Sequence, residues 1–514
     1  MNGAESLIRT AIAAGVEICF ANPGTTEMPL VAALDSVEGL RPILGLFEGV
    51  CTGAADGYGR MAEKPALTLL HLGPGFANGI ANLHNARRAR SPIVNLIGDH
   101  TTWHVSADSP LTSDIVSLAT PVSGWVRSVV NSGSLAESTA EAIAAAGNAP
   151  GQIATLIIPA DCQWDPAKSH AAPLAPPALS TVSSNAIRLA TESMRRGKKV
   201  ALFIGGTALR ARGLKAAARI ASKTGCQLIC ETFPARLESG AGTPQLDRLP
   251  YFPEQAIEML KPFDEMVIAG ARKPVAFFGY PNLPSSLIPR GVNTTILAGP
   301  TDDVPAALEA LADDMAAQAL VAIPSKIARP ERPVGRLDAV TVGAAIAATM
   351  PEGAIVMDEA ATTGLPLRSA SAAAPPHTYL QLTGGAIGQG LPCATGAAVA
   401  CPDRRVIAFQ ADGSGMYTLQ ALWTQARESL NVTTVLCNNR SYRILQVELS
   451  RAGVTEPGQK ARSLTDLSNP NIDWTSLAKG LGVPGVQVET SEALVRELER
   501  SFSTPGPMLI EVIL

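Results

Sequence analysis

This chain of 514 residues has few aromatic residues and no apolar run of membrane-spanning length. Only 4% of its residues are Phe, Trp or Tyr, and no apolar run approaches the length that spans a bilayer. The first twenty residues lack a basic segment followed by a long apolar core, so they do not resemble a secretory signal. These absences predict a soluble protein with no membrane partner, which we expect to be cytoplasmic.

Clustered positive charge and paired cysteines are also missing. The net charge is −4, and the densest basic run is the short one at Arg87, Arg88 and Arg90, so no nucleic-acid partner is expected. The eight cysteines are scattered without a CxxC pair, and Cys226 and Cys230 have no histidine partners. The pattern predicts buried, reduced thiols and argues against a zinc site.

What the chain does contain is an alternation of short apolar strands and Ala-rich helices. Its composition, 46% hydrophobic and 17% charged, is typical of a compact α/β enzyme. Continuous apolar strands such as ALTLLH and VTTVLC predict parallel sheets that are covered on both faces. Proline-rich stretches at 163–184 and 324–336 have the composition of linkers. We therefore expect three doubly wound parallel-sheet α/β domains, at 1–165, 185–323 and 337–514.

Residues 411–439 join a carboxylate turn to a pair of asparagines. The segment opens with Ala-Asp-Gly-Ser and ends at Asn439, after the strand VTTVLC. A βαβ unit can bring both ends to one edge of a parallel sheet, where ligands of α/β proteins bind. Mg²⁺ prefers oxygen ligands and commonly binds one carboxylate together with phosphates. Asp412, the Asn439 amide oxygen and a nearby main-chain carbonyl therefore predict a metal–diphosphate site.

Three other segments place polar residues at the ends of predicted strands. Glu48 follows the apolar run PILGLF and begins a small-residue helix, where it either stabilises the helix N-terminus or serves as a buried reactive carboxyl. His71 ends the strand ALTLLH before a Gly-Pro-Gly loop, a position that suits a structural or a catalytic histidine. In NPGTTE, Thr25 or Thr26 is expected to cap a helix that has Glu27 in its first turn.

Two glycine-rich segments are weaker signals for phosphate binding. Residues 382–398, LTGGAIGQGLPCATGAA, lead into a helix but match neither GxGxxG nor the P-loop pattern. In the middle of the chain, VALFIGGTALRARG shows a strand, a glycine pair and a helix. This segment would suit a nucleotide site or an ordinary sheet-to-helix turn, and we favour the turn.

Taken together, these residues resemble the thiamine-diphosphate (ThDP) enzyme family that includes acetolactate synthase, benzoylformate decarboxylase and pyruvate decarboxylase. The resemblance covers essentially the whole chain. ADGS…NN is similar to the family's GDG…NN signature, with Ala411 in place of its first glycine, and residues 47–61 match the family's glutamate motif. The resemblance implies ThDP and Mg²⁺ as cofactors. The implied contacts are Glu48 at the pyrimidine, Gly385 and Ile387 supporting the bent cofactor, Gly413 and Ser414 at the diphosphate, and Asp412, Asn439 and the Ser441 carbonyl at the metal.

The same resemblance implies an assembly. In this family the cofactor lies between the first domain of one subunit and the third domain of another. We therefore expect a homodimer or homotetramer that has its active sites at the subunit interface, and an inactive monomer.

Different features of the sequence favour different reactions within this family. His71, the NPGTTE segment and the length are similar to benzoylformate decarboxylase, with Thr25 where that enzyme has a serine. Its second proton-relay histidine has no counterpart, because no histidine lies between His170 and His377. We therefore favour an acetolactate synthase-like carboligase, which decarboxylates a 2-oxo acid and transfers the acyl carbanion to a second carbonyl. The alternatives are a simple 2-oxo acid decarboxylase of the benzoylformate type and a non-catalytic ThDP-binding homologue.

The carboligase hypothesis assigns further residues. His71 and Asp99 would handle protons, and Phe76, Ile444 and Leu445 would shape the acyl pocket. The middle domain shows no convincing flavin-binding loop of the acetolactate synthase kind, so FAD is a cofactor that we consider but do not favour.

Overall fold

The computed structural model describes residues 1–318 and 326–514, which form two compact units. Unit 1 consists of Met1–Pro177, Arg329–Ser371 and Gln381–Leu514, and unit 2 of Ala178–Ala328 and Ala372–Leu380. The boundary at Pro177 falls within the predicted first linker. Residues 372–380 of the predicted third domain belong to unit 2. The predicted end of the central domain at residue 323 and the start of the second linker at Pro324 lie outside the described residues.

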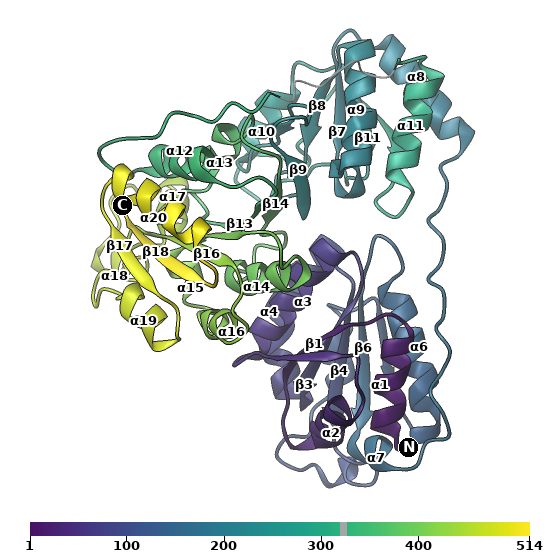
Figure 1. The fold of residues 1–514 in the computed structure, drawn as a ribbon. Helices are drawn as coiled ribbons and strands as arrows, with labels where there is room; N and C mark the ends of the chain where they lie inside the picture. Colours follow the sequence, from purple (N-terminus) through teal and green to yellow (C-terminus); the bar gives the residue numbers. More distant parts are fainter. Residues whose placement is uncertain (319–325) are drawn as a thin grey trace. The chain divides into compact units, whose positions relative to one another are not determined.

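The first layer of unit 1 is a parallel sheet at the amino-terminal end of the chain (Figure 1). Its strands, in spatial order, are β2 (Arg41–Leu44), β1 (Ile18–Asn22), β3 (Ala66–His71), β4 (Ile93–Asp99), β6 (Ile153–Pro159) and β5 (Trp125–Ser128). Its helices are α1 (Gly3–Ala13), α2 (Met28–Ser36), α3 (Glu48–Ala62), α4 (Leu72–Ala89), α5 (Ile115–Ala119), α6 (Leu135–Ala146) and α7 (Ala160–Trp164).

Alternation along the buried strands explains why helices cover both faces of this sheet. In β3, Leu67 and Leu69 belong to the core cluster that includes α1 and α6, whereas Ala66 and Leu70 belong to the cluster that includes α3 and α4. Successive side chains of a strand point to opposite faces, so a continuous apolar run supplies two cores at once.

The second layer of unit 1 is the carboxy-terminal sheet. Its strands, in spatial order, are β17 (Gly485–Val488), β18 (Met508–Ile513), β16 (Val432–Asn438), β15 (Val406–Ala411) and β13 (Ile355–Glu359), all parallel. Its helices are α12 (Ala339–Thr349), α13 (Leu365–Ala370), α14 (Gly390–Ala400), α15 (Asp412–Gly415), α16 (Ala421–Arg427), α17 (Arg443–Arg451), α18 (Gln459–Ser463), α19 (Trp474–Gly480) and α20 (Ser491–Ser503).

Helices α3 and α14 pack closely against each other and join the two layers of unit 1 (Figure 1). Both helices are rich in small residues. A Cβ atom on Gly396 would overlap the main-chain oxygen of Ala54, and one on Gly57 would overlap that of Cys393. The glycines therefore permit a backbone-to-backbone approach that no larger side chain allows. This contact is important because α3 begins at Glu48, and α14 follows the Gly-rich loop of residues 383–390.

We expect Gly396→Ala to destabilise the protein by about 3 kcal/mol, the upper part of the range for overpacked cores, because the obstacle is main chain and cannot rotate away. A thermal melt would measure the loss. Gly458→Ala is the matched control, since a Cβ there meets open space. Equal melting temperatures for the two variants would contradict this account of the crossing.

Unit 2 has its own parallel sheet and an added antiparallel pair. The sheet order is β10 (Asp247–Arg248), β8 (Gln227–Cys230), β7 (Val200–Ile204), β11 (Glu265–Ala269) and β12 (Asn293–Ala298). Its helices are α8 (Ser184–Arg196), α9 (Ala211–Thr224), α10 (Pro253–Leu260) and α11 (Val304–Asp314). The strand β9 (Arg236–Ser239) pairs antiparallel with β14 (His377–Gln381), which explains why residues 372–380 belong to this unit. The α/β architecture with parallel sheets is thus as predicted, with β9 as an addition.

Across the described residues, no helix combines the length and the apolar character needed to cross a membrane.

Candidate active site

Glu27, His71 and Asp99 lie near the carboxyl edge of the amino-terminal sheet. His71 ends β3, and its Nδ1 lies 2.8 Å from Glu27 Oε2 and 3.3 Å from the Thr26 hydroxyl. Glu27 is fully buried, and its carboxylate also accepts the Thr26 hydroxyl (2.6 Å) and the Gly24 N–H (2.7 Å). A carboxylate on one ring nitrogen fixes the orientation and tautomer of an imidazole and leaves the other nitrogen available.

Sequence reasoning missed this dyad. Glu27 looked like a first-turn helix residue, and it does bond back to the Gly24 N–H, but its partner His71 is far away in the chain. Only the pairing of β1 with β3 brings the two together. The absence of a side chain at Gly98, opposite His71 on β4, is also required, because a Cβ there would overlap the Glu27 carboxylate. Thr25, the predicted substrate residue, is exposed, and its neighbour Thr26 makes the contact to His71.

Asp99 follows Gly98 at the end of β4 and accepts a hydrogen bond from the His100 N–H at 2.8 Å. Burial raises the pKa of this carboxyl, and the nearby negative charge of Glu27 adds to the rise. A carboxyl that keeps its proton to higher pH than usual can serve as an acid. The register of β3 and β4 pairs His71 with Gly98, the residue before Asp99, and the proton role predicted for both residues stays a prediction.

Glu48 is the first residue of α3 and is 9% exposed. Its Oε2 accepts a hydrogen bond from Asn78 Nδ2 at 3.0 Å, and Asn78 lies on α4. The Oε1 atom faces Gly75, where an added Cβ would come within 3.0 Å. The helix N-terminus favours the negative charge, and the glycine leaves room on one side of the carboxylate. Asn78 was not identified from the sequence, which gives no sign that α4 would lie beside Glu48.

The carboxylate turn lies where β15 ends and α15 begins. Asp412 is 1% exposed, and its oxygens accept the N–H groups of Gly413 (2.9 Å) and Arg440 (2.7 Å). Asn439 Oδ1 accepts the Ser441 N–H at 3.0 Å. The parallel pairing of β15 with β16 therefore brings Asp412 beside the main chain that carries Asn439 and Ser441, as the sequence predicted.

This turn fits a hard cation. Burial raises the pKa of Asp412, against the opposing hydrogen bonds from main-chain N–H groups. Within the described residues Asp412 has no ion-pair partner, and the Ser441 hydroxyl is buried without a hydrogen bond. A carboxylate with an adjacent amide oxygen is a donor set that suits Mg²⁺. The described chain holds no cluster of three His, Cys, Asp or Glu for a metal, but this set needs only one such residue.

Gly413 and Ser414 follow Asp412 directly. A Cβ on Gly413 would overlap the Tyr442 ring, so the ring lies close against this turn. The Ser414 hydroxyl accepts a hydrogen bond from Gln410 Nε2 at 2.6 Å and donates to the Ala411 carbonyl at 3.2 Å. The side chain of Ser414 is thus committed within the turn, and any contact of Ser414 with a diphosphate would come from its main chain.

The Gly-rich loop, residues 383–390, runs from β14 to α14. Gly385 is its exposed point and has a positive φ of 79°, and Ile387 is half-buried. In the described chain, protein donors reach the carbonyls of Gly384, Ala386 and Gly388, but none reaches that of Gly385. An exposed, unpaired carbonyl flanked by an isoleucine fits an amino-bearing ring, as the resemblance implies.

The three predicted pocket residues have different surroundings. Phe76 is fully buried in the core cluster under α3 and α4, so its ring packs against apolar side chains there. Ile444 and Leu445 lie on α17, directly after Tyr442, where Ile444 is half-buried and Leu445 is 46% exposed. Their roles in an acyl pocket stay predictions.

The glycine pair of unit 2 is a poor fit for a flavin diphosphate. The Gly206 N–H donates to Glu231 Oε1 at 3.3 Å, and a Cβ on Gly205 would come within 2.9 Å of the same oxygen. A carboxylate therefore takes the donor that a dinucleotide phosphate would use, and its charge would repel that phosphate.

Known proteins match the chain in sequence. Residues 1–118 match the model for the thiamine pyrophosphate enzyme N-terminal TPP binding domain, and residues 364–512 match that for the C-terminal TPP binding domain. The chain is 50% identical to IlvX of Mycobacterium tuberculosis, provisionally named an acetolactate synthase large subunit, over 100% of this chain and 99% of that protein. It is 28% identical to benzoylformate decarboxylase of Pseudomonas aeruginosa, over 97% and 96% of the two chains.

Solved structures share the fold. The ThDP-dependent 4-hydroxybenzoylformate decarboxylase of Rhodococcus jostii RHA1 superposes with a TM-score of 0.88 at 24% identity, covering 99% of this chain and 98% of that one. Benzoylformate decarboxylase from Polynucleobacter necessarius gives 0.86 at 20% identity, covering 100% and 99%. The full-length sequence match and the two TPP-binding models establish the family. The chain belongs to the ThDP-dependent enzymes of the acetolactate synthase and decarboxylase family.

Proposed function

We propose that this enzyme decarboxylates a 2-oxo acid with ThDP and Mg²⁺ and transfers the acyl carbanion to a second carbonyl compound. The observation that carries the choice of carboligation is the composition of the proton-handling edge. It includes His71 with the carboxyls Glu27 and Asp99, and the sequence offers no histidine between His170 and His377 for the second proton relay of a benzoylformate-type decarboxylase. The absence of that second relay histidine favours condensation over protonation to an aldehyde. The 50% identity to a provisionally named acetolactate synthase subunit supports the same choice.

Simple decarboxylation is the second candidate. The His71–Glu27 dyad and the 28% identity to benzoylformate decarboxylase favour it. In both reactions His71 would pass a proton through its second ring nitrogen to the substrate-derived oxygen or carbon, while Glu27 holds the ring in place.

The geometry of the site supports a set of proposed cofactor contacts. ThDP, when bound, supplies the carbon nucleophile that adds to the 2-oxo acid and the ring that accepts the electron pair left by CO₂. Glu48 would hold a proton at the pyrimidine nitrogen, and Asn78 would orient its carboxylate. Gly385 and Ile387 would support the ring, and Asp412, Asn439 and the Ser441 carbonyl would bind Mg²⁺.

We further propose a homodimer or homotetramer with the active sites at the subunit interface, and no bound flavin. The Glu231 carboxylate at the glycine pair supports the second point. All eight cysteines are free, and seven of them are buried, which fits a reducing compartment such as the cytoplasm.

The proposal is tested by incubating the protein with ThDP, Mg²⁺ and a panel of 2-oxo acids, and by measuring both CO₂ and condensed products. Carboligation predicts CO₂ together with an acyloin or acetohydroxy acid. Aldehyde without condensed product would select the decarboxylase, and no CO₂ from any acid would reject both. A yellow purified protein would refute the absence of flavin.

We expect Asp99→Asn to change the dependence of the rate on pH. In the proposed mechanism Asp99 acts as an acid, and burial raises its pKa. The kcat/KM of the wild type should therefore fall as the pH rises through that raised pKa, because Asp99 loses its proton. The folded state is also destabilised as the pH rises through the same pKa, since the charged carboxylate is buried. The variant should therefore lack this limb of the kcat/KM profile and melt at a higher temperature than the wild type at neutral pH. An unchanged profile would contradict the proton role of Asp99.

A further inference from the structure

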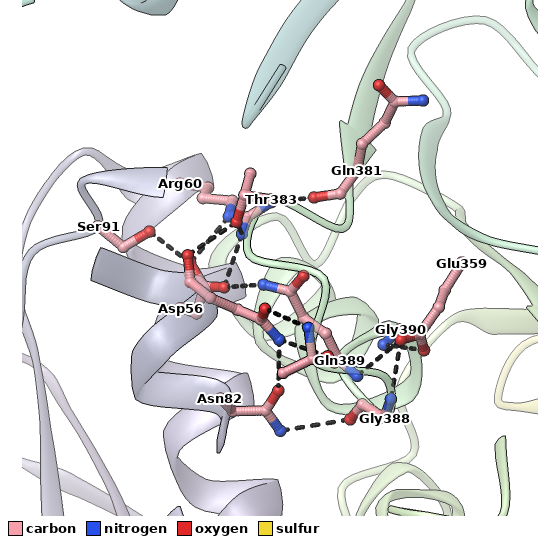
Figure 2. Close-up of polar contacts among 12 residues, drawn as sticks. Asp56, Arg60, Asn82, Ser91, Glu359, Gln381, Thr383, Gly388, Gln389 and Gly390 are labelled. Carbon is pink, nitrogen blue, oxygen red and sulfur yellow. Dashed lines mark hydrogen bonds and ion pairs between the residues drawn. The ribbon is translucent and has the colours of Figure 1, made fainter. Parts of the chain in front are cut away.

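A buried ion pair on α3 holds one side of the Gly-rich loop (Figure 2). The side chains of Arg60 and Asp56 are 1% and 0% exposed and make two hydrogen bonds, of 2.8 and 2.7 Å. Arg60 also donates to the Gln381 carbonyl (2.7 Å) and to the Thr383 hydroxyl (3.1 Å) at the start of the loop. A buried ion pair is costly to desolvate, so it is weak evidence for stability alone. The hydrogen bonds that Arg60 donates to Gln381 and Thr383 indicate that the ion pair also holds the loop in place.

Asp56 also accepts hydrogen bonds from one residue of the same loop and from Ser91, which follows α4. The donors are the side-chain amide of Gln389 and the Ser91 hydroxyl. Gln389 is fully buried and immediately precedes α14. The ion pair is therefore hydrogen-bonded to both ends of the loop, at Thr383 and at Gln389.

A second buried carboxylate holds the other side. Glu359, at the end of β13, accepts the N–H groups of Gly388 (2.8 Å), Gln389 (3.1 Å) and Gly390 (2.7 Å). Gln410 Nε2 donates to it at 3.0 Å and also reaches the Ser414 hydroxyl at 2.6 Å. The main chain of the loop is thereby linked to the turn that carries Asp412.

Asparagines on α4 hold the middle of the loop. Asn85 bonds the Ala386 carbonyl at 2.7 Å and the Ala386 N–H at 3.2 Å. Asn82 Nδ2 lies 2.8 Å from the Gly49 carbonyl and 3.3 Å from that of Gly388, so one amide contacts both the first turn of α3 and the loop. None of these contacts engages the Gly385 carbonyl or the Ile387 side chain.

We propose that Asp56, Arg60, Gln389 and Glu359 are positioning residues of the ThDP site, which fix the loop so that Gly385 and Ile387 are presented to the cofactor ring in one conformation. The inference rests on the proposed function. A loop of this glycine content loses much conformational entropy on ordering, and the network removes that cost from cofactor binding. The same bonds connect α3, which begins at Glu48, to the Asp412 turn.

Two variants of different severity test the proposal. In Glu359→Gln, the amide NH₂ replaces one acceptor oxygen, and either orientation sets a donor against the main-chain N–H groups or against Gln410. In Gln389→Met, only the bond to Asp56 is lost, while Asp56 keeps Arg60 and Ser91. We expect the KM for ThDP to rise about tenfold or more in the first and less in the second, as is usual for groups that orient ligands.

The readout that separates positioning from stability is the behaviour at saturation. Saturating ThDP should restore kcat to near the wild-type value, because binding supplies the order that the network gave. Hydrogen exchange of amides 384–388 in ThDP-free protein should be faster in both variants. A lower melting temperature with unchanged KM and unchanged exchange would overturn the proposal. If Glu359→Gln fails to fold, Gln389→Met decides by the same measurements.

Unit 2 provides the matched control. Glu265 is 2% exposed and accepts hydrogen bonds from Arg196 (2.8 and 2.9 Å), Ser193 (2.7 Å) and Asn293 (3.0 Å). Glu265→Gln should lower the melting temperature and leave the KM for ThDP unchanged. An equal rise of KM in this control would show that the effect is general destabilisation and would refute the positioning role. Failure of the wild-type protein to bind ThDP would instead refute the proposed function.

Discussion

Replacement of Glu48 by Gln is expected to lower kcat by about 10²- to 10⁴-fold, the range for loss of a general acid–base group. Gln keeps the shape of the side chain and can still contact Asn78, but it cannot exchange a proton with a ring nitrogen. The fold should be retained, because the site of substitution is a helix N-terminus with an open glycine beside it. The measurement is the initial rate of CO₂ release at saturating ThDP and Mg²⁺.

Glu63→Gln is the control for this variant. Glu63 is the exposed C-terminal cap of the same helix, so its substitution changes the same charge on α3 at the opposite end. It should have wild-type activity. A Glu48→Gln enzyme with an undiminished rate would refute the assignment of Glu48, whereas a variant that melts early would call for comparison at a lower temperature.

Asp412→Ala is expected to weaken the binding of Mg²⁺ and ThDP by at least about 100-fold. Loss of a residue that only orients a metal ligand costs up to about 100-fold in affinity, and loss of the ligand itself should cost at least as much. The substitution removes the one charged group of the proposed metal site and also frees the N–H groups of Gly413 and Arg440. A ligand that binds only the folded state stabilises it by an amount that grows with the logarithm of its affinity. At a ThDP and Mg²⁺ concentration near the wild-type Kd, the ligands should therefore raise the melting temperature of the wild type and hardly change that of the variant.

The control for Asp412→Ala is Asp403→Ala, since Asp403 is exposed and precedes the opposite end of β15. It should show the full shift in melting temperature with ThDP and Mg²⁺. Titration calorimetry on both variants gives the affinities directly. Wild-type affinity in Asp412→Ala would mean that the metal binds elsewhere.

Local sequence was informative wherever function depends on residues that are close in the chain or at the two ends of one βαβ unit. Asp412 and Asn439 could be placed together because β15 and β16 are consecutive parallel strands. The ends of the consecutive parallel strands β3 and β4 likewise lie at one edge of the sheet, with His71 paired to Gly98. The parallel α/β architecture followed from apolar strands that are buried on both faces.

Residues whose partners come from non-consecutive elements were missed. Glu27 contacts His71 because β1 lies beside β3, although α2, β2 and α3 come between these two strands in the chain. Asn78 reaches Glu48 from a neighbouring helix. In the sequence, Arg60 belonged to a matching motif but had no visible target, since its acceptors at Gln381 and Thr383 lie more than three hundred residues away.

By itself, the sequence indicated a metal–diphosphate site through residue type and spacing, and its resemblance to the ThDP family supplied the cofactor class, which the two TPP-binding domain matches support. It also determined the fold class, because strand periodicity requires two covered faces. Only the tertiary structure decided how those groups are held. The buried carboxylates Glu27, Asp56 and Glu359 each lie where desolvation must be offset by donors from distant segments, and no local pattern can specify such donors.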